Sequence, residues 1–312
     1  MSWPWNDLPG VVESRPHGPD GRSWNLARIE RATAEASTVD TPPILFIHGV
    51  LRNWRTFYPL VERLRADYDL YGLDQRGHGL SSHDLSAAYR VVDYAGDLPH
   101  ILAALPARRV VLYGHSLGGM VALAAAALAP DRVAGLILED PPFSTMGERL
   151  ARLPLRRFFV GVRELLAEQR AAHRPAPTAA TLFEPFSEMI VGETETGAPI
   201  RVRDQRDELS RWFSAKSFSR LDPAVLVPIT DGRWMEGYDT AAILRGVRCP
   251  VALLQADEAC GGMLIDADAD RVLESLGSRC ERVRFPGCGH QLHGTRPDEV
   301  VRAIRELVAR TG

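Results

Sequence analysis

Residues 110–119 read Val-Val-Leu-Tyr-Gly-His-Ser-Leu-Gly-Gly and contain the pattern G-x-S-x-G, with Ser116 at its centre. The β-branched residues before the pattern predict a buried strand, and the alanine-rich residues 117–129 predict a helix that a proline ends. A serine at a sharp turn from strand to helix needs small neighbours, which Gly114 and Gly118 supply. The stretch therefore predicts a nucleophilic serine pushed out of the fold at the start of a helix.

On both sides of this turn, apolar runs alternate with helical patterns, which predicts a parallel sheet with crossover helices. Strands are expected at Ile44–His48, Tyr68–Leu73, Arg109–Gly114, Val133–Glu139, Val251–Ala256 and Glu281–Phe285. The more polar runs Val11–Arg15 and Ser23–Arg31 predict an antiparallel edge hairpin. Helices are expected at Trp54–Arg65, Val91–Leu105 with a break near Pro99, Leu117–Ala129, Ala267–Leu276 and Asp298–Ala309. The sequence thus predicts an α/β fold with a mostly parallel, eight-stranded sheet flanked by helices.

The alternation stops between residues 143 and 246. This stretch contains helical runs, such as Arg149–Gln169 and Asp207–Phe213, and many prolines. We interpret it as a helical cap, residues 143–246, that is inserted into a core domain formed by residues 1–142 and 247–312.

Composition excludes several kinds of partner. The 312 residues carry a net charge of −3, so there is no basic surface for nucleic acid. The longest apolar run, Met120–Ala129, is too short to span a membrane, and no signal peptide is visible at the amino terminus. We expect a cytoplasmic protein that binds neither nucleic acid nor membrane, and the sequence leaves open whether it forms a homo-oligomer.

Two other loops contain residues that could act with the serine. His48-Gly49-Val50 follows the first parallel strand, and the amides of Val50 and Leu117 are the candidates for an oxyanion hole, with the His48 side chain only stabilising the turn. The last strand leads into a glycine-framed His290, the candidate general base. His293 completes an H-x-x-H pattern, but no ligand at suitable sequence spacing supports a metal site, so neither a metal nor a cofactor is expected.

These stretches together resemble the α/β-hydrolase superfamily. The resemblance rests on His48-Gly49, on Asp74-Gln75-Arg76-Gly77-His78-Gly79, on Gly114 to Gly118 and on Gly287 to His290, and it covers nearly the whole chain outside the cap. It implies a catalytic triad of Ser116, His290 and an acid, and a structural role for the Asp74 turn.

The position of the acid departs from the usual superfamily pattern. In most relatives the acid follows the strand that corresponds to Val251–Ala256, and counting from Pro250 places it on Ala259. A second arrangement, similar to some haloalkane dehalogenases and to zearalenone-type lactonases, has the acid after the strand that follows the serine's helix. In this sequence that place is Asp140, which we favour as the acid of the triad. Asp257 is the second candidate and Glu258 is the third.

The resemblance implies a hydrolase that cleaves a carboxylic ester or a lactone through an acyl-enzyme. A serine nucleophile argues against dehalogenases and epoxide hydrolases, which use aspartate. A C–C bond hydrolase or an amidase with the same triad, and a non-catalytic ligand-binding protein of this fold, are the alternatives. Several large side chains in the cap region could line a pocket for a hydrophobic small-molecule substrate, although such residues more often fill a core: Phe143, Trp212, Phe213, Trp234, Met235 and Tyr238.

Overall fold

The computed structural model describes residues 8–31, 41–147, 149–150, 153–172 and 176–311, and its centre is an eight-stranded sheet. The strands are β1 (Val11–Ser14), β2 (Asn25–Ile29), β3 (Ile44–Ile47), β4 (Leu70–Asp74), β5 (Val110–His115), β6 (Val133–Glu139), β9 (Val251–Ala256) and β10 (Cys280–Phe285). Their order is β1-β2-β4-β3-β5-β6-β9-β10. The strands β3, β4, β5, β6, β9 and β10 run parallel, whereas β1 and β2 form an antiparallel hairpin that pairs with β4. The predicted sheet and edge hairpin are confirmed.

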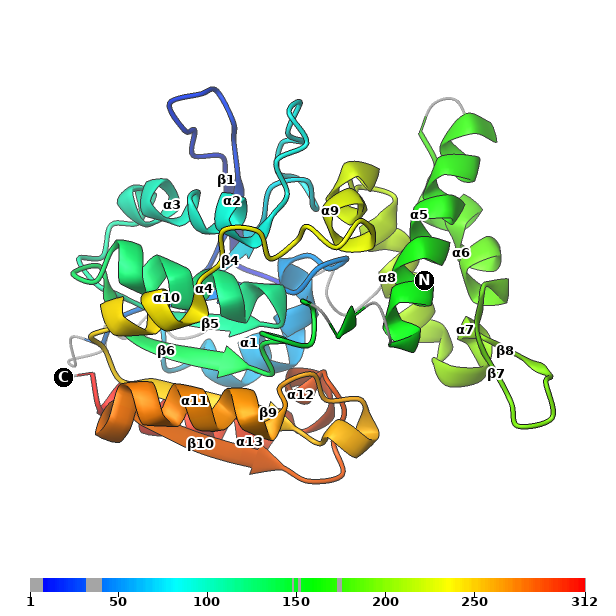
Figure 1. Ribbon diagram of the computed structural model, residues 1–312. Coiled ribbons are helices and arrows are strands. Elements are labelled where there is room, and N and C mark those ends of the chain that lie inside the picture. The colour runs from blue at the N-terminus through cyan, green and yellow to red at the C-terminus, as the bar shows by residue number, and fades with distance from the viewer. Residues whose placement is uncertain (1–7, 32–40, 148, 151–152, 173–175, 312) are drawn as a thin grey trace.

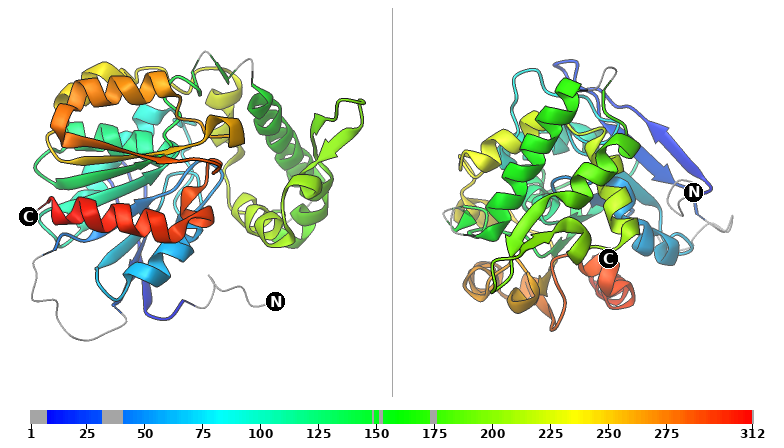
Figure 2. Two further views of the ribbon diagram at one scale, coloured as in Figure 1. Left: turned by 90° about the horizontal axis from the view of Figure 1, so that it is seen from below. Right: turned by 90° about the vertical axis from the view of Figure 1, so that its right-hand side faces the viewer.

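Helices cover both faces of this sheet (Figures 1 and 2). One face is covered by α1 (Tyr58–Leu64) and α13 (Pro297–Ala309), which pack against each other. The other face is covered by α2 (Val91–Ala95), α3 (Leu98–Ala104), α4 (Leu117–Leu128), α10 (Thr240–Gly246) and α11 (Asp266–Leu276). The break between α2 and α3 lies at Gly96 and Asp97, just before Pro99, as predicted. The strands are therefore buried on both faces, which explains their continuous apolar runs.

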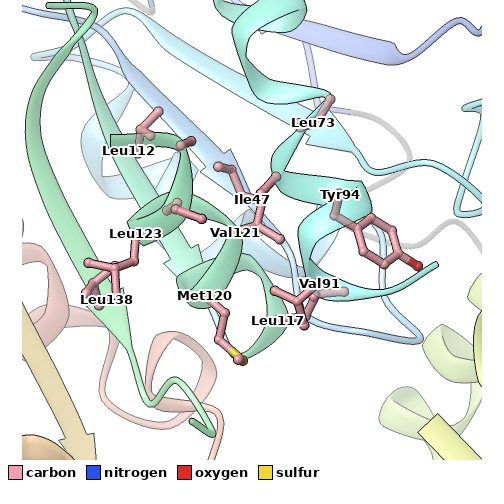
Figure 3. Close-up of a cluster of buried hydrophobic side chains, with 14 of the residues drawn as sticks. Ile47, Leu73, Val91, Tyr94, Leu112, Leu117, Met120, Val121, Leu123 and Leu138 are labelled. Carbon is pink, nitrogen blue, oxygen red and sulfur yellow. The ribbon is translucent and has the colours of Figure 1, made fainter. Parts of the chain in front are cut away.

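Helix α4 holds the serine turn rigidly against the sheet. Its residues from Leu117 to Ala126 are all buried, and Figure 3 shows Leu117, Met120 and Val121 packed beside strand residues such as Ile47. The alanines keep α4 close to the sheet on one side and to α10 on the other. A methyl group on Gly118 would lie 2.0 Å from the Ile47 carbonyl oxygen, so only glycine permits this approach.

The cap lies beside the core (Figure 1) and is formed by α5 (Pro154–Ala172), α6 (Ala179–Glu188), α7 (Val202–Gln205), α8 (Glu208–Phe218) and α9 (Val227–Thr230). It also contains a hairpin of β7 (Ile190–Glu193) and β8 (Pro199–Arg201). The hairpin was not predicted, because the turn that Thr194 and Gly197 close has no clear signal in the sequence. In addition, α10 falls within the range predicted for the cap but packs against α4 and α11 of the core.

Short elements complete the fold. The 3-10 helices are η1 (Trp54–Phe57), η3 (Pro223–Leu226), η4 (Glu258–Cys260) and η5 (Gly277–Arg279), and α12 (Leu292–Thr295) is a single turn before α13. No helix in the described ranges has both the length and the apolar character needed to cross a membrane.

Candidate active site

Ser116 lies at the strained turn between β5 and α4. Its φ of 56° and ψ of −119° place it in a region that few residues other than glycine adopt, and the turn is fixed by a 2.9 Å hydrogen bond from its amide to the Glu139 carbonyl. Ser116 lines a pocket together with His290. Strain of this kind at a buried turn is typical of a functional position.

His290 and Asp140 form a buried pair, although 150 residues separate them in the sequence. His290 Nδ1 lies 2.6 Å from Asp140 Oδ2. The Asp140 carboxylate is fully buried and also accepts hydrogen bonds from the amides of Ala256, Met263 and Leu264 at 3.2, 2.7 and 3.1 Å. These donors compensate the charge of the carboxylate and hold it against the imidazole. The structure thus brings together the three residues predicted as a triad.

The rival acid has a different environment. Asp257 is partly exposed, and its carboxylate accepts hydrogen bonds from the amides of Ala259 and Gly287 at 2.9 Å each. Together with a bond from the Asp257 amide to the Cys288 carbonyl, these contacts join the ends of β9 and β10. Glu258 is exposed and pairs with Arg149. Neither carboxylate contacts His290 in the described structure, so both brace loops.

The predicted oxyanion amides come from two different segments next to the serine. Leu117 opens α4, where the first amides of a helix have no partner within the helix. Val50 follows β3 and lines the same pocket as Ser116. The loop after β3 is fixed by His48, whose Nε2 accepts a 3.0 Å hydrogen bond from the Gln75 amide and whose Nδ1 donates to the Gly49 carbonyl at 2.7 Å. His48 therefore supports the loop from behind, as predicted.

The partner of His48 is His78 of the Asp74 turn. His78 Nε2 accepts from the Leu51 amide at 3.3 Å, and the two rings contact each other edge to face. Asp74 itself accepts from the amides of Trp54 and Leu80, and burial raises its pKa. The turn is thus structural, because its side chains bond to backbone groups.

Acid is expected to destabilise the fold through these two histidines. Burial lowers the pKa of His48 from 6.5 to about 4 and that of His78 to about 3. The unfolded chain therefore takes up protons below pH 6.5 that the folded chain does not, and the free energy of unfolding falls as the pH decreases from 6.5 towards 4. Each histidine contributes a slope of up to about 1.4 kcal/mol per pH unit.

Urea unfolding between pH 7.5 and 4.5 measures this slope. His48→Gln is expected to reduce it, because this variant lacks the imidazole that the folded chain keeps neutral and the unfolded chain protonates. A wild-type slope that persists in His48→Gln would show that other groups dominate the acid response.

A second buried network lies next to the candidate triad. Both oxygens of Glu139 lie 2.9 Å from His293 Nδ1, and Oε2 also accepts from the Tyr113 hydroxyl at 2.5 Å. Burial alone would raise the pKa of Glu139, but the charges of His293 and His115 and these hydrogen bonds bring it below its ordinary value. The His115 ring contacts the His293 ring edge to face, and His115 Nε2 donates to the His290 carbonyl at 2.9 Å, so His115 packs between the network and the loop of the candidate base.

This network also bears on the prediction that no metal is bound. Ligand atoms of His115, Glu139 and His293 lie within 4.8 Å of one another, so Glu139 from β6 is the carboxylate that the H-x-x-H pattern lacked in the sequence. Both Glu139 oxygens already accept hydrogen bonds, and His293 Nε2 lies 3.2 Å from the Thr56 hydroxyl. The arrangement therefore resembles a hydrogen-bonded network more than a set of ligands, and the absence of a metal stays a prediction.

The pocket at Ser116 lies at the carboxyl ends of the parallel strands, beneath the cap, and has a cavity volume of ≈ 100 Å³. The core contributes the loop after β3, the serine turn and the histidine loop. The cap contributes side chains from α5 and α8 and from the segment before α10. The apolar lining consists of Val50, Leu51, Met146, Leu155, Phe158, Phe159, Phe218, Trp234 and Met263, and the polar lining includes Arg52, Arg206, Ser214 and Gln291.

Of the six side chains predicted to line this pocket, the structure places only Trp234 there. Tyr238 is buried and donates to the Met120 carbonyl, and Trp212 stacks on Phe183 within the cap. Phe143 and Met235 line a separate hollow near α10 and α11, and Phe213 lines another near α8. The prediction is wrong for these five as pocket residues, because most of them pack within the cap or the core. No pattern in the sequence distinguishes Phe158, Phe159 or Arg206 as pocket residues.

Comparison with known proteins finds several hydrolases that are similar to this chain. A 2-(acetamidomethylene)succinate hydrolase of Mesorhizobium japonicum is 38% identical over 99 residues, which are 32% of this chain and only about a third, 35%, of that protein. Serine hydrolase-like protein 2 of Homo sapiens is 30% identical over 210 residues, 60% of this chain and 67% of that protein. An esterase structure from Exiguobacterium antarcticum superposes with a TM-score of 0.68 at 17% identity, over 96% of this chain and all of that one.

The family model of the α/β-hydrolase fold matches residues 42–297. The chain therefore belongs to the α/β-hydrolase family.

Proposed function

We propose that the protein is a serine hydrolase that cleaves a carboxylic ester or a lactone through an acyl-enzyme. The observation that carries this proposal is the pocket in which the strained Ser116 faces the same space as His290, whose other ring nitrogen is held by Asp140. Asp140 keeps the proton on Nδ1, so that Nε2 can accept the proton of the serine hydroxyl. The amides of Val50 and Leu117 stabilise the oxyanion.

The reaction has two steps on these residues. Ser116 Oγ attacks the carbonyl carbon while His290 takes its proton and passes it to the leaving alkoxide, which leaves an acyl-enzyme. His290 then removes a proton from water, which attacks the acyl carbon and releases the acid and the free serine. In a lactone the leaving alkoxide stays attached to the acyl group, so a single hydroxy acid is released. The apolar lining supports a hydrophobic carbon skeleton in the substrate.

Fluorophosphonate labelling tests this proposal directly. One adduct per chain on Ser116 is expected by mass spectrometry, with no adduct on Ser116→Ala and much slower labelling of His290→Ala. Folded wild-type protein that takes no label would overturn the enzymatic proposal and favour a non-catalytic binding protein. Product analysis with esters, lactones, amides and vinylogous diketones then separates ester cleavage from the amidase and C–C hydrolase alternatives. The amide arm has specific support, because the relative from Mesorhizobium japonicum is named for hydrolysis of an acetamido compound.

A further inference from the structure

Two arginines line the pocket that contains Ser116. Arg52 lies two residues after the candidate oxyanion residue Val50, and Arg206 comes from the cap, between α7 and α8. The two side chains therefore approach the same cavity from the core and from the cap.

Neither guanidinium has a carboxylate partner in the described part of the chain. Burial, followed by the nearby positive charge of Arg206, lowers the pKa of Arg52 to about 9. Burial alone lowers the pKa of Arg206. By contrast, Arg76, which is buried in the core, forms ion pairs with Asp97 and Asp84. Two cations gathered without an anion are costly, and a bound anion would offset that cost.

The contacts of Arg52 and Arg206 fix the planes of the two guanidinium groups and leave some of their N–H groups available to a ligand. Arg52 Nη1 donates to Ser214 Oγ at 3.1 Å, and Nη2 and Nε lie 2.6 and 3.3 Å from the Gln291 oxygen when that amide turns its oxygen towards them. A guanidinium has five N–H groups, so two on Arg52 remain for a ligand. Arg206 lies over the Phe158 ring, with its central carbon 5.0 Å from the ring centroid. Both guanidinium groups are therefore held by neutral partners.

We propose that Arg52 and Arg206 bind a free carboxylate of the substrate, so that the substrate class is an ester or lactone that carries a second, unesterified carboxyl group. Guanidinium groups match carboxylates in shape and charge. The spacing between the two groups of the substrate is short, because Gln291 directly follows His290 and Arg52 is close to Val50. The apolar side chains hold the intervening carbons. This inference rests on the proposed hydrolase function for its kinetic test but predicts binding on its own.

Matched methyl esters test the proposal. Monomethyl succinate and monomethyl glutarate carry the free carboxylate, whereas methyl butanoate and methyl pentanoate have the same carbon skeleton with a methyl group in its place. Wild-type kcat/KM is expected to favour the half-esters. Because a hydrogen bond to a charged group contributes a factor of about 10 to 100, Arg52→Met and Arg206→Met should each lower the ratio of half-ester to neutral ester by about that factor. Arg245→Met, which removes an exposed arginine outside the pocket, should leave the ratio unchanged.

Binding to Ser116→Ala separates the two proposals. Calorimetric titration with succinate should show binding that Arg206→Met in the same background weakens by about 10-fold or more. Arg-dependent binding of succinate without ester hydrolysis would retain the carboxylate site and overturn the ester proposal. Hydrolysis of the neutral esters at equal or higher kcat/KM than the half-esters, or a ratio unchanged in both arginine variants, would overturn the carboxylate proposal.

Discussion

Asp140→Asn is expected to lower kcat by about 10⁴-fold. The asparagine amide cannot accept from the three backbone amides of Ala256, Met263 and Leu264 and from His290 as the carboxylate does. With its oxygen turned towards the amides of Ala256 and Leu264, its NH2 group takes the place of Oδ2, where it loses the bond from the Met263 amide and donates to His290 Nδ1. The proton of the imidazole then resides on Nε2, which can no longer accept the proton of Ser116. The loss should fall on kcat with little change in KM, because Asp140 does not line the pocket.

Asp257→Asn is the matched control, since it makes the same change at the rival acid. Its kcat is expected to stay within about threefold of wild type, because the Asp257 carboxylate accepts only loop amides. Both variants are compared after urea unfolding has confirmed that each is fully folded. An Asp140→Asn enzyme with near wild-type kcat, or a large loss in Asp257→Asn, would contradict the assignment of the acid.

The sequence favoured Asp140 as the acid because Ala259 occupies the usual place, and in the structure Asp140 is the carboxylate that contacts His290. The second buried pair, Glu139 with His293, was not predicted. Its residues stand next to those of the first pair in the sequence, because Glu139 precedes Asp140 and His293 follows three residues after His290. Successive side chains of a strand point to opposite faces, so Glu139 turns towards His293 and Asp140 towards His290. Pairing of distant carboxylates with distant histidines depends on which strands and loops meet, and periodicity along the chain does not contain that information.

The cap was the least predictable region. The periodic patterns located α5 and α8 but not α6 or the β7–β8 hairpin, because short elements rich in proline and polar residues have weak periodicity. The prediction of the residues that line the pocket was mostly wrong for a related reason. Aromatic residues such as Trp212, which stacks on Phe183, pack within the cap itself, and only the packing of helices decides which aromatic residues face Ser116. Arg52 could not be distinguished as a binding residue in the sequence, because arginines are scattered along the whole chain.

Glu139→Leu is expected to lower the free energy of unfolding by about 3 to 5 kcal/mol. The substitution leaves His293 and the Tyr113 hydroxyl buried without their acceptor, and leucine fills much of the volume of the glutamate, so a cavity contributes little. The folded-state pKa of Glu139 lies below its ordinary value, so this contribution is fully present at neutral pH and is lost as the pH falls below about 4.5. Urea unfolding at pH 7 measures the difference.

Two further variants distinguish the effect of breaking the buried Glu139–His293 pair from the effect of removing any carboxylate. Glu258→Leu removes an exposed carboxylate that pairs with Arg149 and should cost less than about 1 kcal/mol. The double variant Glu139→Leu, His293→Phe should cost less than the sum of the two single variants, because the second substitution removes the imidazole that the first leaves unpaired. Costs that simply add would mean that Glu139 and His293 do not stabilise each other.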